Sequence, residues 1–347
     1  MRIIHILSSN KFSGAERVAI QIIQYLGRQG VDAWYISVRG KIEERLKKEK
    51  ISYYLAEKMN LDNIKKIVKK LKPDIIHAHD YRASIICAFS TNIPVLSHLH
   101  NNSPWIKKYG LYSWIYAASS VRYKKILLVS NAILKEYVFS KQITNKCRVI
   151  GNPVRIGEIV KKGKENVVEE EYDIIFVGRL TPSKNPILLL EVMYEIKKYD
   201  PGIRLCIVGT GELLEKSKET CRKLGLEKNV VWKGFVENPF PYMVRAKIFL
   251  LPSSWEGFGL AAVEALALGK PVVCRNVGGL NNIVNERCGF LCEGKEELVE
   301  ACRKLLGDRE LYKRMAEMAL SRAEEMDNDR SYMEGLWEIY QEICMEH

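Results

Sequence analysis

The first 150 residues alternate short apolar runs with amphipathic stretches. Five runs rich in aliphatic side chains predict buried strands, at 2–8, 32–38, 74–79, 94–100 and 125–130. Between them, apolar residues recur at helical spacing in 16–30, 61–72 and 81–90. Because strands and helices alternate, the pattern predicts a parallel sheet that is covered by helices on both faces.

The alternation breaks once and then resumes. Residues 156–171 are polar and charged with little periodicity, which predicts a linker or a surface excursion. A second series of strands and helices begins at residue 172. The predicted fold class is therefore α/β, with two Rossmann-like doubly wound domains, 1–155 and 172–328, facing each other across a cleft. The amphipathic stretch 329–347 predicts a C-terminal helix that docks on the N-terminal domain.

The positive charge is concentrated in the first half of the chain. The 347 residues carry a formal net charge of +12. Residues 1–150 contain 26 Lys and Arg against 10 Asp and Glu, whereas residues 151–347 contain 28 against 32. Two interpretations stay open at this point: ordinary solvated helix faces, or attraction to an anionic surface such as a membrane or a nucleic acid.

The sequence shows no sign of a membrane span, of export or of a cysteine metal site. No run reaches the roughly 18 apolar residues of a transmembrane helix, and the apolar run after Met1 is too short for a signal peptide. Nine cysteines are scattered through mostly apolar runs, which indicates a reduced, cytoplasmic protein. Cys288 and Cys292 lack a second pair at metal-binding spacing.

Two cations follow the first strand of the second domain. Arg179 and Lys184 lie in FVGRLTPSKNP, just before a predicted helix. An arginine grips two oxygens and a lysine supplies a mobile charge, so the pair suits a diphosphate. The next strand ends in VGTGE, where Gly209 and Gly211 form part of a dinucleotide fingerprint that lacks its third glycine. This pattern favours close approach of a nucleobase and does not establish NAD.

Two acids bracket a glycine turn in PSSWEGFGLAAVEALALGKP. Glu256 precedes Gly257 and Gly259, and an apolar helix carrying Glu264 follows. A buried carboxylate is costly unless something pairs with it, and a helix N-terminus is a ready anion site. We therefore expect Glu264 to accept the hydroxyls of a ribose and Glu256 to meet a sugar hydroxyl.

Polar residues also follow the strands of the first domain. Gly14 opens a helix, as part of either a phosphate-binding turn or a simple helix cap. His98 and His100 share one face of a strand end, and His77 and His79 lie at another strand end. Nothing in the sequence holds the two histidine pairs together. We therefore expect no metal site and predict that His100 hydrogen-bonds a substrate.

Together these motifs resemble the retaining glycosyltransferases of family 4, which have the GT-B fold. The resemblance is carried by Glu256 and Glu264 in their motif and by the following Gly278 and Gly279. The resemblance is supported by four further motifs, so that it spans nearly the whole chain: VGRLTPSKNP, VGTGE, GNPV (151–154) and SGAER. It implies transfer of a sugar from a nucleotide donor with retention of configuration, in synthesis of a capsule or exopolysaccharide.

The resemblance implies a role for each candidate residue. Arg179 and Lys184 neutralise the donor diphosphate, Glu264 holds the ribose and Glu256 contacts the donor sugar. His100 approaches that sugar from the N-terminal domain. The other implied donor contacts are Gly14, Gly209, Gly211, Phe258, Gly259 and Leu260. The family's loop commonly has two adjacent glycines, and Ser13 replaces the first of them here.

The implied reaction needs no metal or other cofactor. Two fixed cations and a helix N-terminus can stabilise the departing diphosphate. In this family retention is usually explained by front-face attack, in which the leaving phosphate takes the proton of the acceptor. The sequence therefore names no catalytic base.

The family also implies the partners of the protein. The N-terminal domain would bind the acceptor, often lipid-linked, at the cytoplasmic face of the membrane. UDP is the expected donor nucleotide, with GDP as the alternative. The basic stretch 41–72 and the aromatic–basic stretch 105–125 predict peripheral binding to an anionic membrane. A nucleic-acid binder would leave Glu256 and Glu264 unexplained. A nucleotide-sugar epimerase and an NAD-dependent oxidoreductase remain alternative enzymes.

Overall fold

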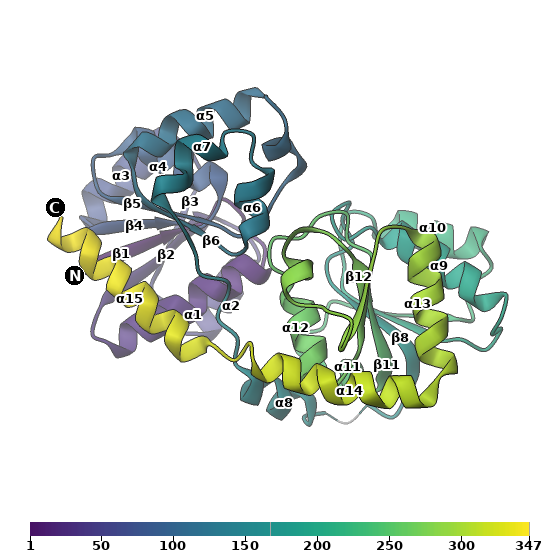
Figure 1. The fold of residues 1–347 in the computed structure, drawn as a ribbon. Helices are drawn as coiled ribbons and strands as arrows, with labels where there is room; N and C mark the ends of the chain where they lie inside the picture. Colours follow the sequence, from purple (N-terminus) through teal and green to yellow (C-terminus); the bar gives the residue numbers. More distant parts are fainter. Residues whose placement is uncertain (167, 347) are drawn as a thin grey trace. The chain divides into compact units, whose positions relative to one another are not determined.

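A computed structural model describes residues 1–166 and 168–346 and divides the chain into two compact units. The first unit combines Met1–Pro153 with Asp329–His347, and the second unit is Val154–Asn328. Figure 1 traces the chain through the first unit, then through the second, and back to the first. The observed division falls two residues before the predicted boundary at 155.

The first unit is built on a seven-stranded parallel sheet with the order β3-β2-β1-β4-β5-β6-β7. The strands are β1 (Arg2–Ile6), β2 (Asp32–Val38), β3 (Tyr53–Ala56), β4 (Ile75–Ala78), β5 (Val95–Leu99), β6 (Tyr123–Leu128) and β7 (Cys147–Val149). The five predicted strands are present. The two unpredicted strands, β3 and β7, are the short edge strands, which are less covered and therefore lack a long aliphatic run.

Helices cover both faces of this sheet. They are α1 (Gly14–Arg28), α2 (Ile42–Lys48), α3 (Leu61–Leu71), α4 (Tyr81–Ser90), α5 (Leu111–Ser119), α6 (Asn131–Glu136), α7 (Ser140–Ile143) and α15 (Asp329–Met345). Short 3₁₀ turns lie at Pro104–Lys107, Ser120–Arg122 and Thr144–Lys146. Helix α1 packs against β2 and α15 against β4, whereas α3, α4 and α5 pack side by side over the opposite face (Figure 1).

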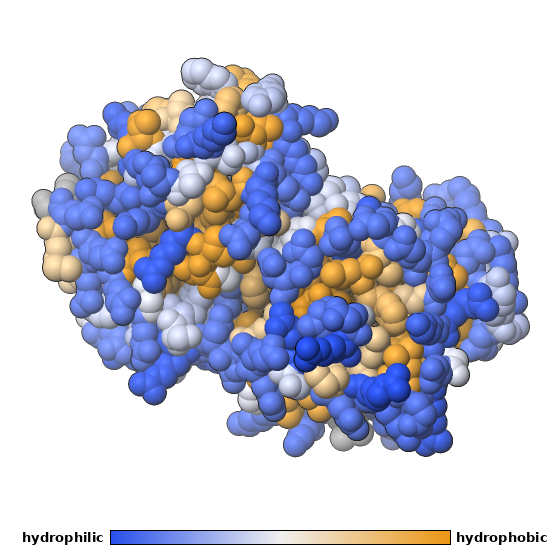
Figure 2. Space-filling view, in the orientation of Figure 1, coloured by the Kyte–Doolittle hydropathy of each residue, from blue (hydrophilic) through white to orange (hydrophobic). Residues whose placement is uncertain are grey.

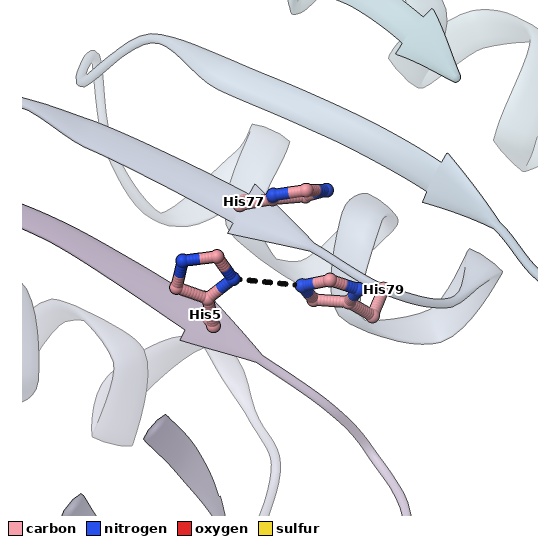
Figure 3. A group of neighbouring side chains, drawn as sticks. All are labelled: His5, His77 and His79. Atoms are coloured by element: carbon pink, nitrogen blue, oxygen red, sulfur yellow. Dashed lines mark hydrogen bonds between the residues drawn. The ribbon is translucent and has the colours of Figure 1, made fainter. Parts of the chain in front are cut away.

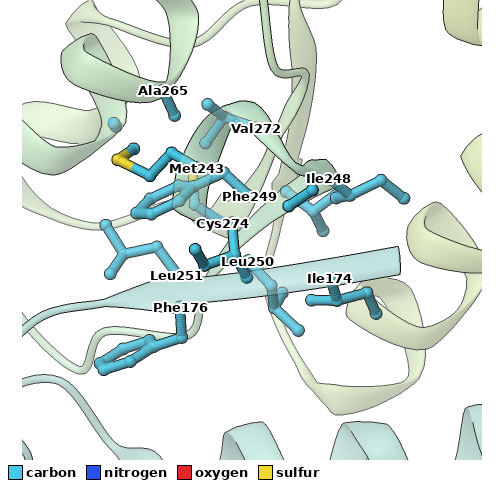
Figure 4. Close-up of a cluster of buried hydrophobic side chains, with 14 of the residues drawn as sticks. Ile174, Phe176, Met243, Ile248, Phe249, Leu250, Leu251, Ala265, Val272 and Cys274 are labelled. Carbon is cyan, nitrogen blue, oxygen red and sulfur yellow. The ribbon is translucent and has the colours of Figure 1, made fainter. Parts of the chain in front are cut away.

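The second unit has a six-stranded parallel sheet with the order β10-β9-β8-β11-β12-β13. Its strands are β8 (Tyr172–Val177), β9 (Leu205–Val208), β10 (Val230–Gly234), β11 (Ala246–Leu251), β12 (Val272–Arg275) and β13 (Gly289–Cys292). The central strands are buried on both faces, and their sequences are therefore continuous apolar runs. Figure 4 shows Phe176, Phe249 and neighbouring aliphatic side chains interdigitating between this sheet and its helices.

The helices of the second unit form two groups. They are α8 (Ile156–Gly163), α9 (Pro186–Lys197), α10 (Leu214–Lys223), α11 (Phe240–Val244), α12 (Leu260–Ala267), α13 (Lys295–Gly307) and α14 (Arg309–Glu324), with a 3₁₀ turn at Gly278–Asn282. Helices α9, α10 and α13 pack together, and α12 packs with α8 and α14. Among the described residues of both units, every helix is too short or too polar to cross a bilayer.

The prediction of a linker or surface excursion at 156–171 is wrong for the first half of that segment. Residues 156–163 form helix α8, which packs against α11 and α12. Ile159 is buried on its inner side, and Gly163 lies so close to Leu268 that a methyl group would crowd it. The charged residues that obscured the periodicity lie on the exposed side of a helix of only eight residues.

Helix α15 belongs to the first unit and is anchored there by apolar and polar contacts. Its buried residues are Tyr332, Met333, Leu336, Ile339, Tyr340 and Ile343. The Tyr340 hydroxyl lies 2.6 Å from Nδ1 of His77, which is fully buried on β4. Tyr332 is also buried on α15, but its hydroxyl has no hydrogen-bond partner among the described residues.

These two tyrosines form a matched pair for a stability test. Tyr340→Phe leaves the buried His77 nitrogen without a partner, so we expect the free energy of unfolding to fall by about 1–3 kcal/mol. Tyr332→Phe removes an unpaired hydroxyl and should be neutral or slightly stabilising. Denaturant unfolding of the two variants measures the difference. Equal effects would show that the contact with His77 contributes nothing to stability.

Candidate functional site

The candidate site of the second unit lies where the strand order of its sheet reverses. Strands β8 and β11 are neighbours, but the chain leaves them toward opposite edges of the sheet. Ligands in open parallel sheets bind beyond the carboxyl ends of the strands at such a point. The loop 178–185 follows β8, the loop 252–259 follows β11, and the Ser254 amide donates to the Ser183 carbonyl at 2.7 Å.

An ion pair joins the two loops. The Lys184 ammonium contacts the Glu256 carboxylate, and the Ser253 hydroxyl donates to the same carboxylate oxygen at 3.2 Å. Both charged side chains are mostly buried, with 19% and 14% of their surface exposed. The sequence predicts separate partners for the two residues and gives no sign of this contact, because 72 residues separate them in the chain. The pair fixes both head groups at the carboxyl edge of the sheet.

Arg179 lies in the same loop as Lys184 but is exposed. It forms no ion pair with any residue that the structure describes. Its guanidinium therefore keeps all its donors available for an oxyanion, whereas Lys184 is held by a carboxylate. The structure thus brings Lys184 and Glu256 into contact and leaves Arg179 beside them as an unpaired cation.

The glycines of VGTGE are required by contacts inside the protein. Gly209 has φ +141°, and a side chain there would overlap the carbonyl oxygen of Gly178. A side chain at Gly211 would overlap the backbone of Leu180. The Leu180 amide donates to Thr210 at 3.0 Å, which fastens the loop after β9 to the cation loop. This packing explains both glycines, and their contact with a nucleobase stays a prediction.

The turn between the two acids packs against the next loop. Gly259 has φ +110° and precedes helix α12, and a side chain there would lie 2.6 Å from Leu280. The Gly279 amide donates to the Glu256 carbonyl at 3.1 Å. Phe258 and Leu260 flank Gly259 and are partly buried. The first turn of α12 is thereby held with its amides toward the carboxyl edge of the sheet.

Glu264 is a buried acid on α12. Only 6% of it is exposed, although its neighbours on the helix are apolar. It lies one turn beyond the start of the helix at Leu260. The structure therefore places this carboxylate close behind the glycine turn, as the sequence predicts, and its contact with a ribose stays a prediction.

The start of helix α1 is held by a contact between two side chains. Ser13 precedes α1, and its hydroxyl donates to the Glu16 carboxylate. Glu16 is 2% exposed, so this contact holds the beginning of the helix on the body of the unit. Gly14 is the first residue of α1 and is exposed. Ser13 occupies the N-cap position, but its side chain accepts no hydrogen bond from a backbone amide of this helix, so neither the helix cap nor a donor contact of Gly14 is confirmed.

The first unit also has a basic pocket of about 430 Å³. It lies beside loops that follow β1, β2 and β3. Its lining residues are Ser8, Asn10, Val38, Arg39, Glu57, Lys58, Met59, Asn60 and Arg82. Three cations against one acid make the pocket suitable for an anionic ligand. Of these cations only Lys58 lies in the predicted basic stretch 41–72, because the three come from separate segments of the chain.

The four histidines of the first unit that were predicted to be unconnected lie in one cluster, together with His5. His79 Nδ1 lies 3.1 Å from His100 Nε2, and His77 Nε2 lies 3.1 Å from His98 Nδ1. Figure 3 shows His5 and His79 facing each other, and their ring nitrogens are 2.9 Å apart. The expectation that nothing holds the pairs together was wrong, because β1, β4 and β5 are neighbours in the sheet.

Burial keeps these imidazoles neutral. It lowers the pKa of His5 to about 3. It also lowers the pKa values of His77, His79 and His98 well below their usual range, and the neighbouring histidines add to the effect. Each of these rings therefore has one protonated nitrogen and one with a free lone pair at neutral pH.

Comparison with known families identifies both halves of the chain. The model described as "Glycosyl transferases group 1" matches residues 158–322, and "Glycosyltransferase Family 4" matches residues 12–158. An Escherichia coli UDP-Gal:alpha-D-GlcNAc-diphosphoundecaprenol alpha-1,3-galactosyltransferase is 28% identical over 330 residues, which cover 84% of each chain. A glycosyltransferase of Methanocaldococcus jannaschii is 29% identical over 60% of this chain and 57% of its own length.

The structural comparison extends over the whole chain. The crystal structure of HepE from Anabaena in complex with UDP-glucose matches with a TM-score of 0.86. The match covers 99% of this chain and all of HepE at 21% identity. At this level of identity the match shows a common fold.

The packing of the VGTGE loop is tested by two alanine variants. Gly209→Ala combines a left-handed backbone with overlap on the Gly178 carbonyl, so it should lower the free energy of unfolding of the second unit by about 3 kcal/mol or more. Gly225→Ala is the control, since Gly225 has φ +64° but nothing within 4 Å of an added methyl group, and should cost about 1 kcal/mol. Denaturant titration distinguishes them. Equal losses would contradict the close approach.

Proposed function

Since the chain belongs to the family 4 glycosyltransferases with the GT-B fold, we propose that it transfers a sugar from a UDP-linked donor to a lipid-linked or oligosaccharide acceptor. The product would be a cell-surface polysaccharide or its precursor. The observation that carries the proposal is the group Arg179, Lys184 and Glu256 at the reversal point of the second sheet.

The second unit supplies the donor site in this proposal. Arg179 grips the diphosphate with its unpaired guanidinium, and Lys184 adds a second positive charge. Glu264 accepts the ribose hydroxyls and Glu256 a hydroxyl of the sugar. HepE, whose fold matches this chain, was solved with UDP-glucose, and this supports UDP as the nucleotide.

The ion pair between Lys184 and Glu256 gives the site a way to respond to its ligand. A diphosphate oxygen competes with the carboxylate for the ammonium, which frees a Glu256 oxygen for the sugar. The charge that develops on the diphosphate is stabilised by Arg179, Lys184 and the amides at the start of α12. These groups are held in place before the ligand arrives, so no metal is needed at the diphosphate in this proposal.

The transfer itself exchanges one bond for another. The bond between the anomeric carbon and the diphosphate oxygen breaks, and the acceptor oxygen bonds to the same carbon. The proton of the acceptor hydroxyl passes to the departing diphosphate. Attack from the side of the leaving group retains the anomeric configuration and requires no enzymic nucleophile.

The first unit supplies the acceptor site in this proposal. The basic pocket with Arg39, Lys58 and Arg82 suits an acceptor that carries phosphate. The E. coli relative is named for a diphosphoundecaprenol acceptor, which has that chemistry. An acceptor with a lipid chain places the protein at the cytoplasmic face of a membrane. His100, which belongs to this unit, keeps its predicted role at the donor sugar.

An exposed aromatic surface around α5 favours contact with the membrane. It consists of Tyr109, Leu111, Tyr112, Trp114 and Val121, each at least 65% exposed. Lys107, Lys108 and Arg122 lie within the same stretch. Figure 2 shows near-neutral and hydrophobic side chains at the surface of this part of the first unit, among hydrophilic ones. Aromatic and basic residues together are typical of a surface that lies at a lipid interface.

Donor binding is tested with a thermal-shift panel of nucleotide sugars. A ligand at 100 times its dissociation constant adds about 2.7 kcal/mol of stability, so the true donor should raise the melting temperature by roughly 5–10 °C. Arg179→Ala removes the main diphosphate contact and should weaken donor binding about 10- to 100-fold.

Arg204→Ala is the control for that variant. Arg204 immediately precedes β9, at the opposite edge of the same sheet, and its guanidinium lies 5.4 Å from the Tyr172 ring centroid. Donor binding should therefore be unchanged. If the Arg179→Ala protein binds donor as well as the Arg204→Ala protein does, Arg179 is not a diphosphate ligand.

Two further measurements test the reaction itself. Incubation of donor without acceptor should release no epimer, and NMR of the transfer product should show the anomeric configuration of the donor.

Membrane binding is tested by sedimentation with vesicles at low salt. The protein should pellet with anionic vesicles and less with neutral ones. Trp114→Ser should weaken binding about tenfold, because burial of a large side chain contributes about 1.5–3 kcal/mol. Phe235→Ser is the control, since Phe235 is 66% exposed on the second unit. Equal recovery in the supernatant with both kinds of vesicle argues against membrane binding.

A further inference from the structure

Five of the six histidines of the chain form one buried cluster in the first unit. They are His5 on β1, His77 and His79 at β4, and His98 and His100 at β5. Neighbouring ring centroids lie 3.9–5.5 Å apart. Buried positions of a parallel sheet are normally aliphatic, so five imidazoles packed together at such positions require an explanation of their own.

Hydrogen bonds connect the imidazoles in two rows. One row runs from His100 through His79 to His5. The other runs from His98 through His77 to the Tyr340 hydroxyl. The two rows are in contact: the His77 ring stacks on the His79 ring, and the His98 and His100 rings lie 3.9 Å apart at a tilt of 36°. Nε2 of His5 and Nε2 of His98 are buried and have no partner among the described residues.

We propose that His79, His98 and His100 form a binding site for a transition metal ion of the Zn²⁺ class. Each offers one ring nitrogen, and the three nitrogens lie within 4.8 Å of one another. Tetrahedral Zn²⁺ with bonds of 2.0–2.1 Å holds its ligand nitrogens about 3.3 Å apart. The 3.1 Å separation of His79 Nδ1 and His100 Nε2 is close to that value. Small movements of the rings would admit an ion.

The chemistry of the cluster fits such an ion. A metal needs neutral imidazoles, and burial keeps these rings neutral. Nitrogen ligands suit Zn²⁺, Co²⁺, Ni²⁺ and Cu²⁺, whereas Mg²⁺ and Ca²⁺ require oxygen. An ion bound by three histidines keeps a fourth position for water or another ligand.

A second group, His5, His77 and His79, has the same ligand spacing but is harder to reach. All three residues are fully buried, and His77 Nδ1 is bonded to Tyr340 of α15. His100 is partly exposed at the end of β5, so an ion can enter the first group from the carboxyl edge of the sheet. The two groups share His79 and differ in their other two ligands.

Metal binding goes beyond the proposed function and is measured without a transfer assay. Titration of metal-free full-length protein with Co²⁺ should give the visible absorption of a tetrahedral site, saturating at one ion per chain. Zn²⁺ should abolish the signal by competition. Thiolate ligation has its own near-ultraviolet bands, which should be absent. Seven of the nine cysteines are buried, and burial raises, for example, the pKa of Cys292 to about 12.

Two matched variants locate the ion. His98→Gln removes a proposed ligand and should weaken Co²⁺ binding by roughly 100-fold or more, since loss of even an outer-shell partner costs 10–100-fold. His5→Gln removes the hydrogen-bond partner of the His79 ring but no proposed ligand, so it should weaken Co²⁺ binding much less than His98→Gln, by about tenfold or below. In both variants the glutamine amide can replace a hydrogen bond of the lost imidazole. His100→Gln, at a partly exposed position, replaces His98→Gln if that variant does not fold.

Three results overturn the proposal. Wild-type protein that gives no tetrahedral Co²⁺ signal shows that the cluster is only a hydrogen-bonded network. Loss of binding in His5→Gln but not in His98→Gln places the ion in the other group. Thiolate bands place it on cysteine. Failure of donor binding to Arg179 would leave each of these results unaffected, because Arg179 belongs to the other unit.

Discussion

Every strand pair in both sheets is parallel, and this constraint decides where the polar chemistry of the protein can lie. A parallel pair cannot be joined by a hairpin, so each connection crosses a face of the sheet and each strand delivers its following loop to one edge. Where the strand order reverses, two adjacent loops leave toward opposite faces. In the second unit these are the loops after β8 and β11, which carry Lys184 and Glu256 into contact.

The site is held in place chiefly by backbone contacts. Gly209 and Gly211 let the loop after β9 press against Gly178 and Leu180, and Gly279 lets the loop after β12 press against the glycine turn before α12. Each glycine removes the side chain that would separate two loops. The cation loop is therefore fastened on both sides, which fixes its backbone, while the ion pair with Glu256 fixes the Lys184 ammonium. Charges fixed in advance stabilise developing negative charge more effectively than charges that must first reorganise.

Much of this arrangement can be predicted from the sequence, because its determinants are local. Aliphatic runs mark the central strands, and the positions of Arg179, Lys184, Glu256 and Glu264 after those strands follow from the strand–loop–helix order. The edge strands β3 and β7 and helix α8 cannot be found in this way, since partial exposure and charge hide their periodicity. The contact of Lys184 with Glu256 depends on strand order, which local patterns do not specify.

The histidine cluster shows the same limit in the first unit. His5 pairs with His77 in register only because β1 lies beside β4, and this is the reversal point of the first sheet. There the Ser8 amide donates to the Asp80 carboxylate at 2.7 Å, which joins the loops after these two strands. The same topology thus concentrates polar groups at equivalent points of both sheets: an ion pair in the second unit, and mostly buried, neutral imidazoles beside the Asp80 carboxylate in the first. Neutral imidazoles tolerate a buried position that the carboxylate and ammonium of the second unit occupy only as a pair.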